Sequence, residues 1–333
     1  MTDLIKIAVD AMGGDGSPKK VIDGIIYNHK SNQENYFKIF GDKNQISKLI
    51  NNKIDKRFYE IIHTENTVKS TDSPLEAAKK GKDTSMWLSI ESVKKKESDI
   101  VISAGNTGAL LVISKLNLKM IENIDKPALS ALWPNKKGMS VVLDLGANIE
   151  CSSKNLVDFS IMGSALYKSL YPKENPNVAL LNIGSEELKG NETIKETFQK
   201  LNEKKSKNLN FSGYIEGNQL MDGNVNVIVS DGFTGNVALK TAEGTANFIT
   251  NELKQALNGN LLGKISSLLN ISNLRKFKKR LDPRLYNGAI FIGLDTPVVK
   301  SHGGTDYIGF SNSLDVCNKI IKGNLIDKIN ENI

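Results

Sequence analysis

Runs of β-branched and other apolar residues alternate along this chain with segments of helical periodicity. Eight of the runs are strand candidates, and most of these are nearly continuous rather than alternating, which is typical of strands covered on both faces of a sheet. They are residues 4–10, 36–42, 58–64, 99–104, 139–145, 177–183, 226–231 and 288–293. Helical patterns lie between them, so the sequence predicts an α/β fold with a largely parallel, Rossmann-like sheet wound on both faces.

The chain shows no obvious division into domains. Its 333 residues, 39% hydrophobic and 24% charged, can bury a large core. No linker rich in Pro, Gly or Ser and no sustained block of charge interrupts the pattern. We therefore expect residues 1–333 to form a single catalytic unit, and we expect no membrane span because no run of about 18 uncharged apolar residues occurs.

Residues 258–284 have a different character and are expected to be an inserted amphipathic helical pair. The apolar phase changes within residues 270–273, which predicts two short helices joined by a break. A basic amphipathic helix suits an anionic membrane surface or an acidic carrier protein, and packing on a partner subunit is the alternative. The residues expected to contact membrane or carrier protein are Leu261, Leu262, Ile265, Leu268, Arg275, Lys276 and Lys279.

Glycine-bearing junctions follow several of the predicted strands. Two share the pattern Ser-x-Gly-x-Thr-Gly, and the full set is residues 9–18, 103–108, 143–150, 181–191, 230–235 and 299–306. Ligands of open parallel sheets bind beyond the carboxyl ends of the strands, where loop amides and helix dipoles attract anions. Helix capping by Asn and Thr is the structural alternative for each single loop. Six such junctions favour an anion site.

Four aspartates also close or follow predicted strands, namely Asp10, Asp15, Asp144 and Asp231. We expect them to converge on the same edge of the sheet, where carboxylates orient amides or hold a cation. Because no DxD-type pair occurs, neither a metal ion nor another cofactor is expected.

The motifs that are absent narrow the chemistry. The chain lacks the phosphate loop of nucleoside triphosphatases, the dinucleotide fingerprint, the nucleophile elbow and the zinc motifs. His302 is the one histidine that we select as a site residue. The two cysteines, Cys151 and Cys317, lie far apart, which suits a reduced, cytoplasmic setting. Cys151 has no neighbouring His and is expected to be inert rather than nucleophilic.

The net charge of +7, from 44 Lys and Arg against 37 Asp and Glu, suits acidic partners or a membrane surface. Codon bias toward Lys is the alternative explanation. No nucleic-acid partner is expected.

Seven segments occur in an order and spacing that resemble one bacterial family. They are "IAVDAMGGDGSP", "SAGNTGAL", "KPALSALWP", "LDLGAN", "LNIGSEELKGN", "SDGFTGNVALK" and "PVVKSHGGTD". They are similar to the phosphate acyltransferases of phospholipid synthesis, the PlsX family. The chain departs from the family pattern at Gly16, at Ser185 and at the pair Gly304–Thr305. These departures concern the contacts to phosphate rather than the type of reaction.

The resemblance implies a homodimeric enzyme that transfers a fatty acyl group from acyl carrier protein to inorganic phosphate. It implies a fold similar to phosphate acetyltransferases and isocitrate-dehydrogenase-like enzymes, and peripheral membrane association of the helical pair. It also suggests the downstream membrane glycerol-3-phosphate acyltransferase as a partner, because that enzyme would consume the acyl-phosphate.

For such a reaction the enzyme must hold an oxoanion against a thioester and stabilise the charge that develops. The residues assigned to catalysis are Asn106, Thr107, Lys300, His302 and Asp231. Those assigned to binding phosphate or acyl thioester are Asp10, Gly13, Gly14, Asp15, Gly105, Gly108, Asp144, Gly146, Asn148, Gly232, Thr234, Gly235, Asn236 and Gly303. A dehydrogenase on the same fold, a non-catalytic membrane scaffold and an acyltransferase that uses coenzyme A thioesters remain alternatives.

Overall fold

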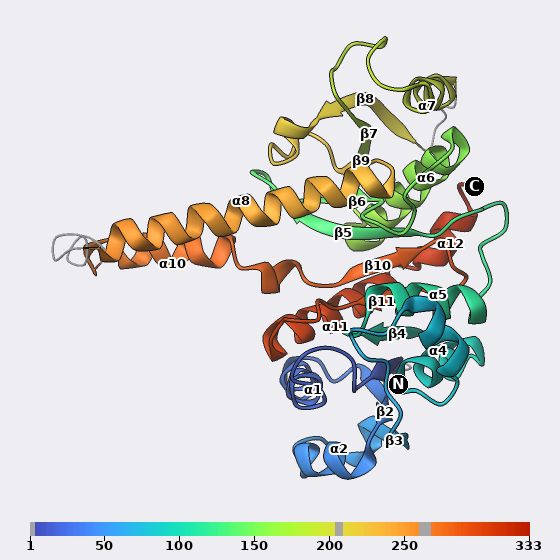
Figure 1. The fold of residues 1–333 in the computed structure, drawn as a ribbon, viewed down its shortest axis with the longest axis vertical. Helices are drawn as coiled ribbons and strands as arrows, with labels where there is room; N and C mark the ends of the chain where they lie inside the picture. The colour runs from blue at the N-terminus through green and yellow to red at the C-terminus, as the bar shows by residue number, and fades with distance from the viewer. Residues whose placement is uncertain (1–3, 204–208, 260–267) are drawn as a thin grey trace.

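The computed structural model describes residues 4–203, 209–259 and 268–333 of the chain. Within them an 11-stranded sheet has the order β3-β2-β1-β4-β11-β10-β5-β6-β9-β7-β8. Figure 1 shows it as the central layer of the body, with helices on both faces. The α/β fold expected from the sequence is confirmed.

The strands are short, and most carry the apolar runs that predicted them. Their bounds are β1 Ile5–Asp10, β2 Asn35–Gly41, β3 Tyr59–His63, β4 Ile100–Ser103, β5 Ala128–Pro134, β6 Met139–Leu143, β7 Asn177–Asn182, β8 Asn210–Glu216, β9 Val227–Val229, β10 Ala289–Ile292 and β11 Val298–Lys300. All eight predicted strands are present. The sequence missed β5 and β8, which have mixed burial patterns, and β11, which is only 3 residues long.

Helices connect most of the strands. The α-helices are α1 Lys19–Ser31, α2 Lys43–Ile50, α3 Pro74–Lys80, α4 Ser85–Lys94, α5 Thr107–Asn117, α6 Ser153–Leu170, α7 Glu192–Glu203, α8 Gly232–Asn258, α10 Ile271–Arg280, α11 Tyr307–Lys322 and α12 Leu325–Asn330. Short 3₁₀ turns are η1 Lys56–Phe58, η2 Gly217–Gln219 and η3 Pro283–Tyr286.

The sheet consists of two parallel sets that run in opposite directions. Strands β3, β2, β1, β4 and β11 are mutually parallel, and so are β6, β9, β7 and β8. Between the two sets, β11 pairs with β10, β10 with β5 and β5 with β6, each in antiparallel fashion. An odd number of antiparallel pairings reverses the strand direction, so the carboxyl ends of the two sets do not lie along one edge.

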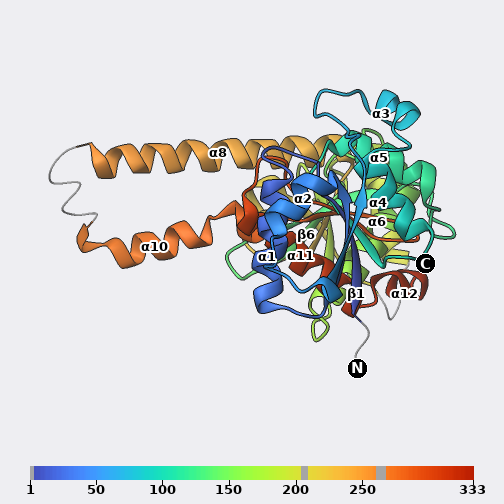
Figure 2. The ribbon, with the colours of Figure 1, turned by 90° about the horizontal axis from the view of Figure 1, so that it is seen from below.

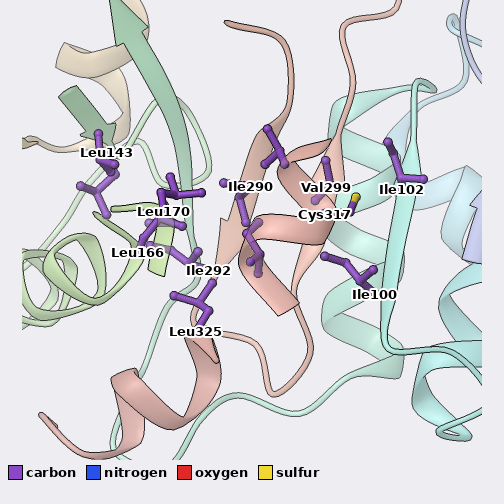
Figure 3. Close-up of a cluster of buried hydrophobic side chains, with 14 of the residues drawn as sticks. Ile100, Ile102, Leu143, Leu166, Leu170, Ile290, Ile292, Val299, Cys317 and Leu325 are labelled. Carbon is purple, nitrogen blue, oxygen red and sulfur yellow. The ribbon is translucent and has the colours of Figure 1, made fainter. Parts of the chain in front are cut away.

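Alternate residues of each strand pack against different helix layers, as the two-residue period of a strand requires. In β4, Ile100 and Ile102 pack into the cluster that includes residues of α1, α6 and α11, whereas Val101 packs into the cluster of α4 and α5. Figure 3 shows the first cluster continuing without a break from Leu143 and Leu166 across Ile290 to Val299 and Ile102. The buried core therefore joins the two halves of the sheet.

Helices α8 and α10 project together from the body, and we call them the arm (Figures 1 and 2). Helix α8 is 27 residues long and ends at Asn258, where the expected pair, residues 258–284, begins. The first helix of that pair falls largely on residues 260–267, outside the described residues, and α10 lies where the second is expected. The inner part of α8 packs on the sheet through Ala238, Leu239 and Ala242. Its outer part is largely exposed. Of the expected contact residues, Leu261, Leu262 and Ile265 lie outside the described residues.

Candidate active site

The loops at the carboxyl ends of β1, β4 and β11 lie together and form what we call the first loop group, residues 11–18, 104–106 and 301–306. These strands are neighbours in the sheet, with Asp10, Ser103 and Lys300 in register. The loops contact each other through the main chain. The Asp15 N–H donates to the Gly303 carbonyl at 3.0 Å, and a Cβ added to Gly13 would lie 2.6 Å from the Gly105 nitrogen. Glycine is required at residue 13 because two backbones approach so closely.

Asp10 holds the base of this group and is only 1% exposed. Its carboxylate accepts the Ser85 and Ser103 hydroxyl groups, each at 2.6 Å, and the Met12 N–H at 3.2 Å. Ser103 Oγ in turn accepts the Gly105 N–H at 3.0 Å. Burial raises the pKa of Asp10, and these hydrogen bonds oppose the rise. Asp10 therefore ties β1, β4 and α4 together.

Two buried lysines bring positive charge to the first loop group. Lys20 and Lys300 are each 8% exposed. Lys20 Nζ donates to the Gly303 carbonyl at 2.6 Å, and Lys300 Nζ donates to the Ser301 carbonyl. Burial lowers the pKa of both, and for Lys300 burial together with the charge of Lys20 lowers it to about 8 against the raising effect of Asp10.

His302 is an exposed residue of the loop after β11. Burial of its ring and the charge of Lys300 lower the pKa of His302, and Glu243 opposes this. Its Nδ1 accepts the Gly304 N–H at 3.2 Å, so Nε2 carries the proton of the neutral ring. The side chain is thus able to donate a hydrogen bond from Nε2.

The amino end of α5 completes the first loop group. Asn106 caps this helix, since its Oδ1 accepts the Ala109 N–H at 3.0 Å. Its Nδ2 donates at 3.1 Å to the carbonyls of Ser70 and Asp72, which holds the loop before α3. Within the described part of the chain, the N–H groups of Thr107 and Gly108 have no hydrogen bond. Free first-turn amides and the helix dipole favour an anion at this point.

A second loop group, residues 144–151 and 230–236, follows β6 and β9. Its centre is Asp144, which is fully buried. The carboxylate accepts the main-chain N–H groups of Leu129, Gly146, Ala147 and Asn148 at 2.8–3.1 Å, together with Asn148 Nδ2 at 2.8 Å. Burial raises the pKa of Asp144, and these bonds lower it. Its oxygens are thus occupied by the protein's own donors.

Asp231 and Asn236 of the second loop group also have partners in the protein. Asp231 caps α8 by accepting the Thr234 N–H at 2.8 Å and the Thr234 hydroxyl at 2.8 Å. Asn236 Nδ2 donates to the Leu145 carbonyl at 2.9 Å. Cys151 lies here too, and burial together with the charge of Asp144 raises its pKa to about 11, which makes it a poor nucleophile.

The expectation that the four aspartates share one edge of the sheet is wrong. Asp10 and Asp15 belong to the first loop group, whereas Asp144 and Asp231 belong to the second, because the strand direction reverses between the two sets. Helix α8 connects the two loop groups. It begins in the second loop group, and its Lys240 and Glu243 lie close enough to His302 of the first loop group to affect the pKa of that histidine.

The family is decided by comparison with known proteins. A family model described as "Fatty acid synthesis protein" matches residues 5–328. Over 333 residues the chain is 75% identical to the phosphate acyltransferase of Pelagibacter ubique (strain HTCC1062), with 100% of both chains covered. This chain belongs to the phosphate acyltransferase family. It is also 44% identical over 334 residues to the phosphate acyltransferase of Rhodospirillum rubrum, covering 100% of this chain and 95% of that one.

Solved structures with low sequence identity share the fold of this phosphate acyltransferase. A phosphotransacetylase from Streptococcus pyogenes matches with a TM-score of 0.61 and 15% identity, over 97% of this chain and 94% of that one. The EutD phosphotransacetylase from Staphylococcus aureus matches with a TM-score of 0.60 and 15% identity, over 96% and 94% of the two chains. The chain is an acyltransferase of fatty acid and phospholipid synthesis with a Rossmann-like α/β fold.

Sequence reasoning missed three polar residues that hold the first loop group. Ser85 donates to Asp10, Ser103 bonds to Asp10 and Gly105, and Lys20 donates to the Gly303 carbonyl. Ser103 stands in the repeated Ser-x-Gly-x-Thr-Gly pattern, which is the signal that could have found it. Lys20 lies in the first turn of α1, two residues after the junction 9–18, which could have indicated it, whereas Ser85 starts α4 outside any motif and only the fold brings it to the site.

The arm of this acyltransferase carries the residues expected to contact a membrane or carrier protein, as far as they are described. Leu268 is 71% exposed, and Arg275, Lys276 and Lys279 are exposed along α10. None of the described helices is both long and apolar enough to cross a membrane. Among the described side chains, no cluster of three His, Cys, Asp or Glu residues forms a metal site.

Substitution of Gly13 by Ala is expected to impair phosphate use. The new Cβ would lie 2.6 Å from the Gly105 nitrogen and 2.8 Å from its Cα, so the loops after β1 and β4 must separate. We expect the KM for phosphate to rise by roughly 10- to 100-fold, from about 1–3 kcal/mol of overpacking at the site. Steady-state kinetics measure this. Gly217→Ala is the control, because a Cβ there meets nothing within 4 Å. An unchanged KM in Gly13→Ala would contradict the close packing of these loops.

Proposed function

We propose that this phosphate acyltransferase transfers a fatty acyl group from acyl carrier protein to inorganic phosphate, and that the first loop group binds the phosphate. The observation that carries the proposal is the convergence of two buried lysines and the free first-turn amides of α5 at three neighbouring strand ends. Buried cations and oriented amides bind oxoanions more strongly than exposed ones, because little solvent screens them. Each loop group has a buried carboxylate, Asp10 or Asp144, but among the described residues the buried lysines, Lys20 and Lys300, both lie at the first group, so the second is less suited to an anion.

In the proposed reaction, a phosphate oxygen attacks the carbonyl carbon of the acyl thioester. The new C–O bond forms, the C–S bond breaks, and the leaving thiolate takes a proton. The products are acyl-phosphate and the carrier thiol. Phosphate is already nucleophilic near neutral pH, so the enzyme contributes mainly by positioning the two reactants and stabilising the oxyanion.

The site residues have distinct parts in this proposal. Lys300 and Lys20 balance the charge of the phosphate, and the N–H groups of Thr107 and Gly108 bind its oxygens. His302 donates from Nε2 to the oxyanion or to the departing sulfur. Asn106 acts through its capping of α5, which places those amides. Asp10 fixes the loops that surround them.

Product formation tests the proposal directly. The enzyme is incubated with an acyl-carrier thioester and labelled orthophosphate, and the label is sought in a hydroxylamine-sensitive acyl-phosphate. A parallel reaction contains a coenzyme A thioester in place of the carrier thioester. We expect labelled product with the carrier thioester. Equal rates with coenzyme A would remove the carrier specificity, and no labelled product from either donor would contradict the reaction.

We further propose that the arm associates with an anionic membrane surface or with the acidic carrier protein in the cytoplasm. The support is the combination of exposed apolar residues, Leu268 at 71% and Leu269 at 81%, with the exposed basic side chains of α10. Apolar insertion and basic attraction reinforce each other at an anionic surface. Association with the membrane would also bring the product close to a membrane glycerol-3-phosphate acyltransferase.

A flotation assay tests whether the arm binds a membrane surface. The double substitution Leu268→Glu, Leu269→Glu is expected to reduce binding to vesicles that contain anionic lipid by at least about tenfold, because two exposed apolar contacts become charged. A charge-matched control is the double substitution Asn44→Glu, Ser47→Glu, at two exposed, uncharged positions of α2 that also changes the net charge by −2. Undiminished flotation of the Leu268→Glu, Leu269→Glu variant would remove the membrane role of these residues.

A homodimer is the last part of the proposal. Phe233, Val237 and Phe248 of α8 recur at helical spacing and are 63%, 51% and 65% exposed. An exposed apolar stripe along a helix favours a protein partner, and a second copy of the chain is the one that the family resemblance suggests. Sedimentation of the wild type and of Phe233→Glu tests this, and a monomeric wild type would contradict it.

A further inference from the structure

The arm returns to the body through a short segment that contacts the first loop group. This segment, residues 282–287, contains the 3₁₀ turn η3 and leads into β10, and we call it the arm root. In Figure 1 it runs from α10 to the body between α8 and α11. The arm root lies next to the loop after β11, which contains His302.

Asn287 ends the arm root and is 8% exposed. Its Oδ1 accepts the main-chain N–H of His302 at 2.8 Å. Its Nδ2 donates to Ser301 Oγ at 2.9 Å and to the Gly309 carbonyl at 2.8 Å. Every polar atom of this side chain is thus bonded to the segment that contains the His302 loop or to the first turn of α11. A buried amide with all its bonds satisfied fixes the orientation of its partners.

A second contact ties the arm root to the far end of the same loop. Arg284 Nη1 donates to Asp306 Oδ2 at 2.9 Å, and Arg284 Nε donates to Asp282. The other Asp306 oxygen caps α11 by accepting the N–H groups of Ile308 and Gly309 at 3.1 and 3.0 Å. The loop from Ser301 to Asp306 is therefore held by the arm root at both of its ends.

We propose that Asn287 is a positioning residue for the phosphate site, and that the arm root clamps the loop that presents His302 and Gly303. The proposal rests on the proposed function of the first loop group. Asn287 touches neither Lys20 nor the α5 amides in the described structure, so it acts through the loop. The Gly303 carbonyl accepts both Lys20 Nζ and the Asp15 N–H, and a displaced loop would therefore move the phosphate-binding cation as well.

The decisive substitution is Asn287→Asp, which keeps the shape of the side chain. The Nδ2 donor becomes an oxygen that faces the Gly309 carbonyl, while the acceptor for the His302 N–H remains. We expect the KM for phosphate to rise about 10- to 100-fold, with a much smaller change in the KM for the thioester. The matched control is Asn182→Asp. Asn182 is 9% exposed, and its Nδ2 donates at 3.1 Å to the carbonyls of Gly184 and Lys189, which belong neither to the arm root nor to the first loop group.

Binding without turnover gives the second readout. Inorganic phosphate alone is titrated into the wild type and both variants, and the shift in melting temperature is followed. A phosphate-dependent shift in the wild type and in Asn182→Asp, but a tenfold weaker midpoint in Asn287→Asp, supports the clamp. If Asn287→Asp only melts earlier and keeps the wild-type midpoint and phosphate KM, the clamp is wrong although the proposed function stands. If the wild type neither binds nor consumes phosphate, the proposed function and the clamp both fail.

Discussion

Lys300→Met is expected to lower acyl transfer by at least about 100-fold and to raise the thermal stability of the protein. Loss of a buried cation beside a transition state that gains negative charge costs about 3 kcal/mol or more. The stability gain arises because the charged form of Lys300 is penalised in the fold, where burial and Lys20 lower its pKa to about 8. An apolar side chain of similar length avoids this penalty, and we expect a gain of about 1–3 kcal/mol at pH 7.

The pH dependence of stability tests whether the gain comes from removing the buried charge of Lys300. The pKa of Lys300 is about 8 in the folded protein, and the ordinary value of 10.5 applies to the unfolded chain. Between pH 8 and pH 10.5 the unfolded chain therefore binds a proton at Lys300 that the folded chain does not. Stability of the wild type therefore rises with pH from about 8 to about 10.5 relative to Lys300→Met, and below pH 8 the full penalty is present. Urea unfolding across pH 7–10 measures the difference. The exposed Lys48 on α2, changed to Met, is the control.

Two results would contradict this account of Lys300. Unchanged phosphate kinetics in Lys300→Met would mean that its charge does not face the anion. Lower stability at pH 7 would mean that the hydrogen bond to the Ser301 carbonyl outweighs the cost of burying the charge.

Features that depend on neighbours along the chain could be predicted from the sequence. Eight strands follow from apolar runs, which are mostly buried except in β3, and the capping alternative for Asn106 is confirmed because it caps α5. The Ser-x-Gly-x-Thr-Gly repeats predict turns into helices, and α5 and α8 begin there. The order and spacing of the seven motifs, compared with a known family, also predicted the family.

Features that depend on how distant segments pair could not be predicted. The central strands β10 and β5 reverse the sheet, yet the apolar run of β10 reads like that of a parallel strand, and β5 was missed. The sequence therefore placed Asp144 and Asp10 on one edge. Asp10 accepts a hydrogen bond from Ser85, 75 residues away, and the His302 N–H donates to Asn287, 15 residues away. Neither Ser85 nor Asn287 lies in a motif.

Asp144→Ala is expected to be the most destabilising substitution in the second loop group, at about 3–5 kcal/mol. The carboxylate is fully buried and accepts four main-chain N–H groups and the Asn148 amide. Without it, several buried donors lose their partners, and each unsatisfied donor costs about 1–3 kcal/mol before the loop relaxes. The packing around the loop limits relaxation, since a Cβ at Gly235 would lie 2.0 Å from the Asp144 carbonyl oxygen.

Asp231→Ala provides the matched comparison in the same loop group. Asp231 only caps α8, so its loss is expected to cost about 0.5–2 kcal/mol. Chemical denaturation of the three proteins measures both values, and phosphate kinetics on the folded fraction show whether either carboxylate touches substrate. If Asp144→Ala kept wild-type stability while its phosphate KM changed, Asp144 would be a ligand of the substrate. If Asp144→Ala loses much stability but keeps the phosphate kinetics of the wild type, the second loop group has a structural role at the start of α8. The phosphate is then bound by the lysines of the first loop group.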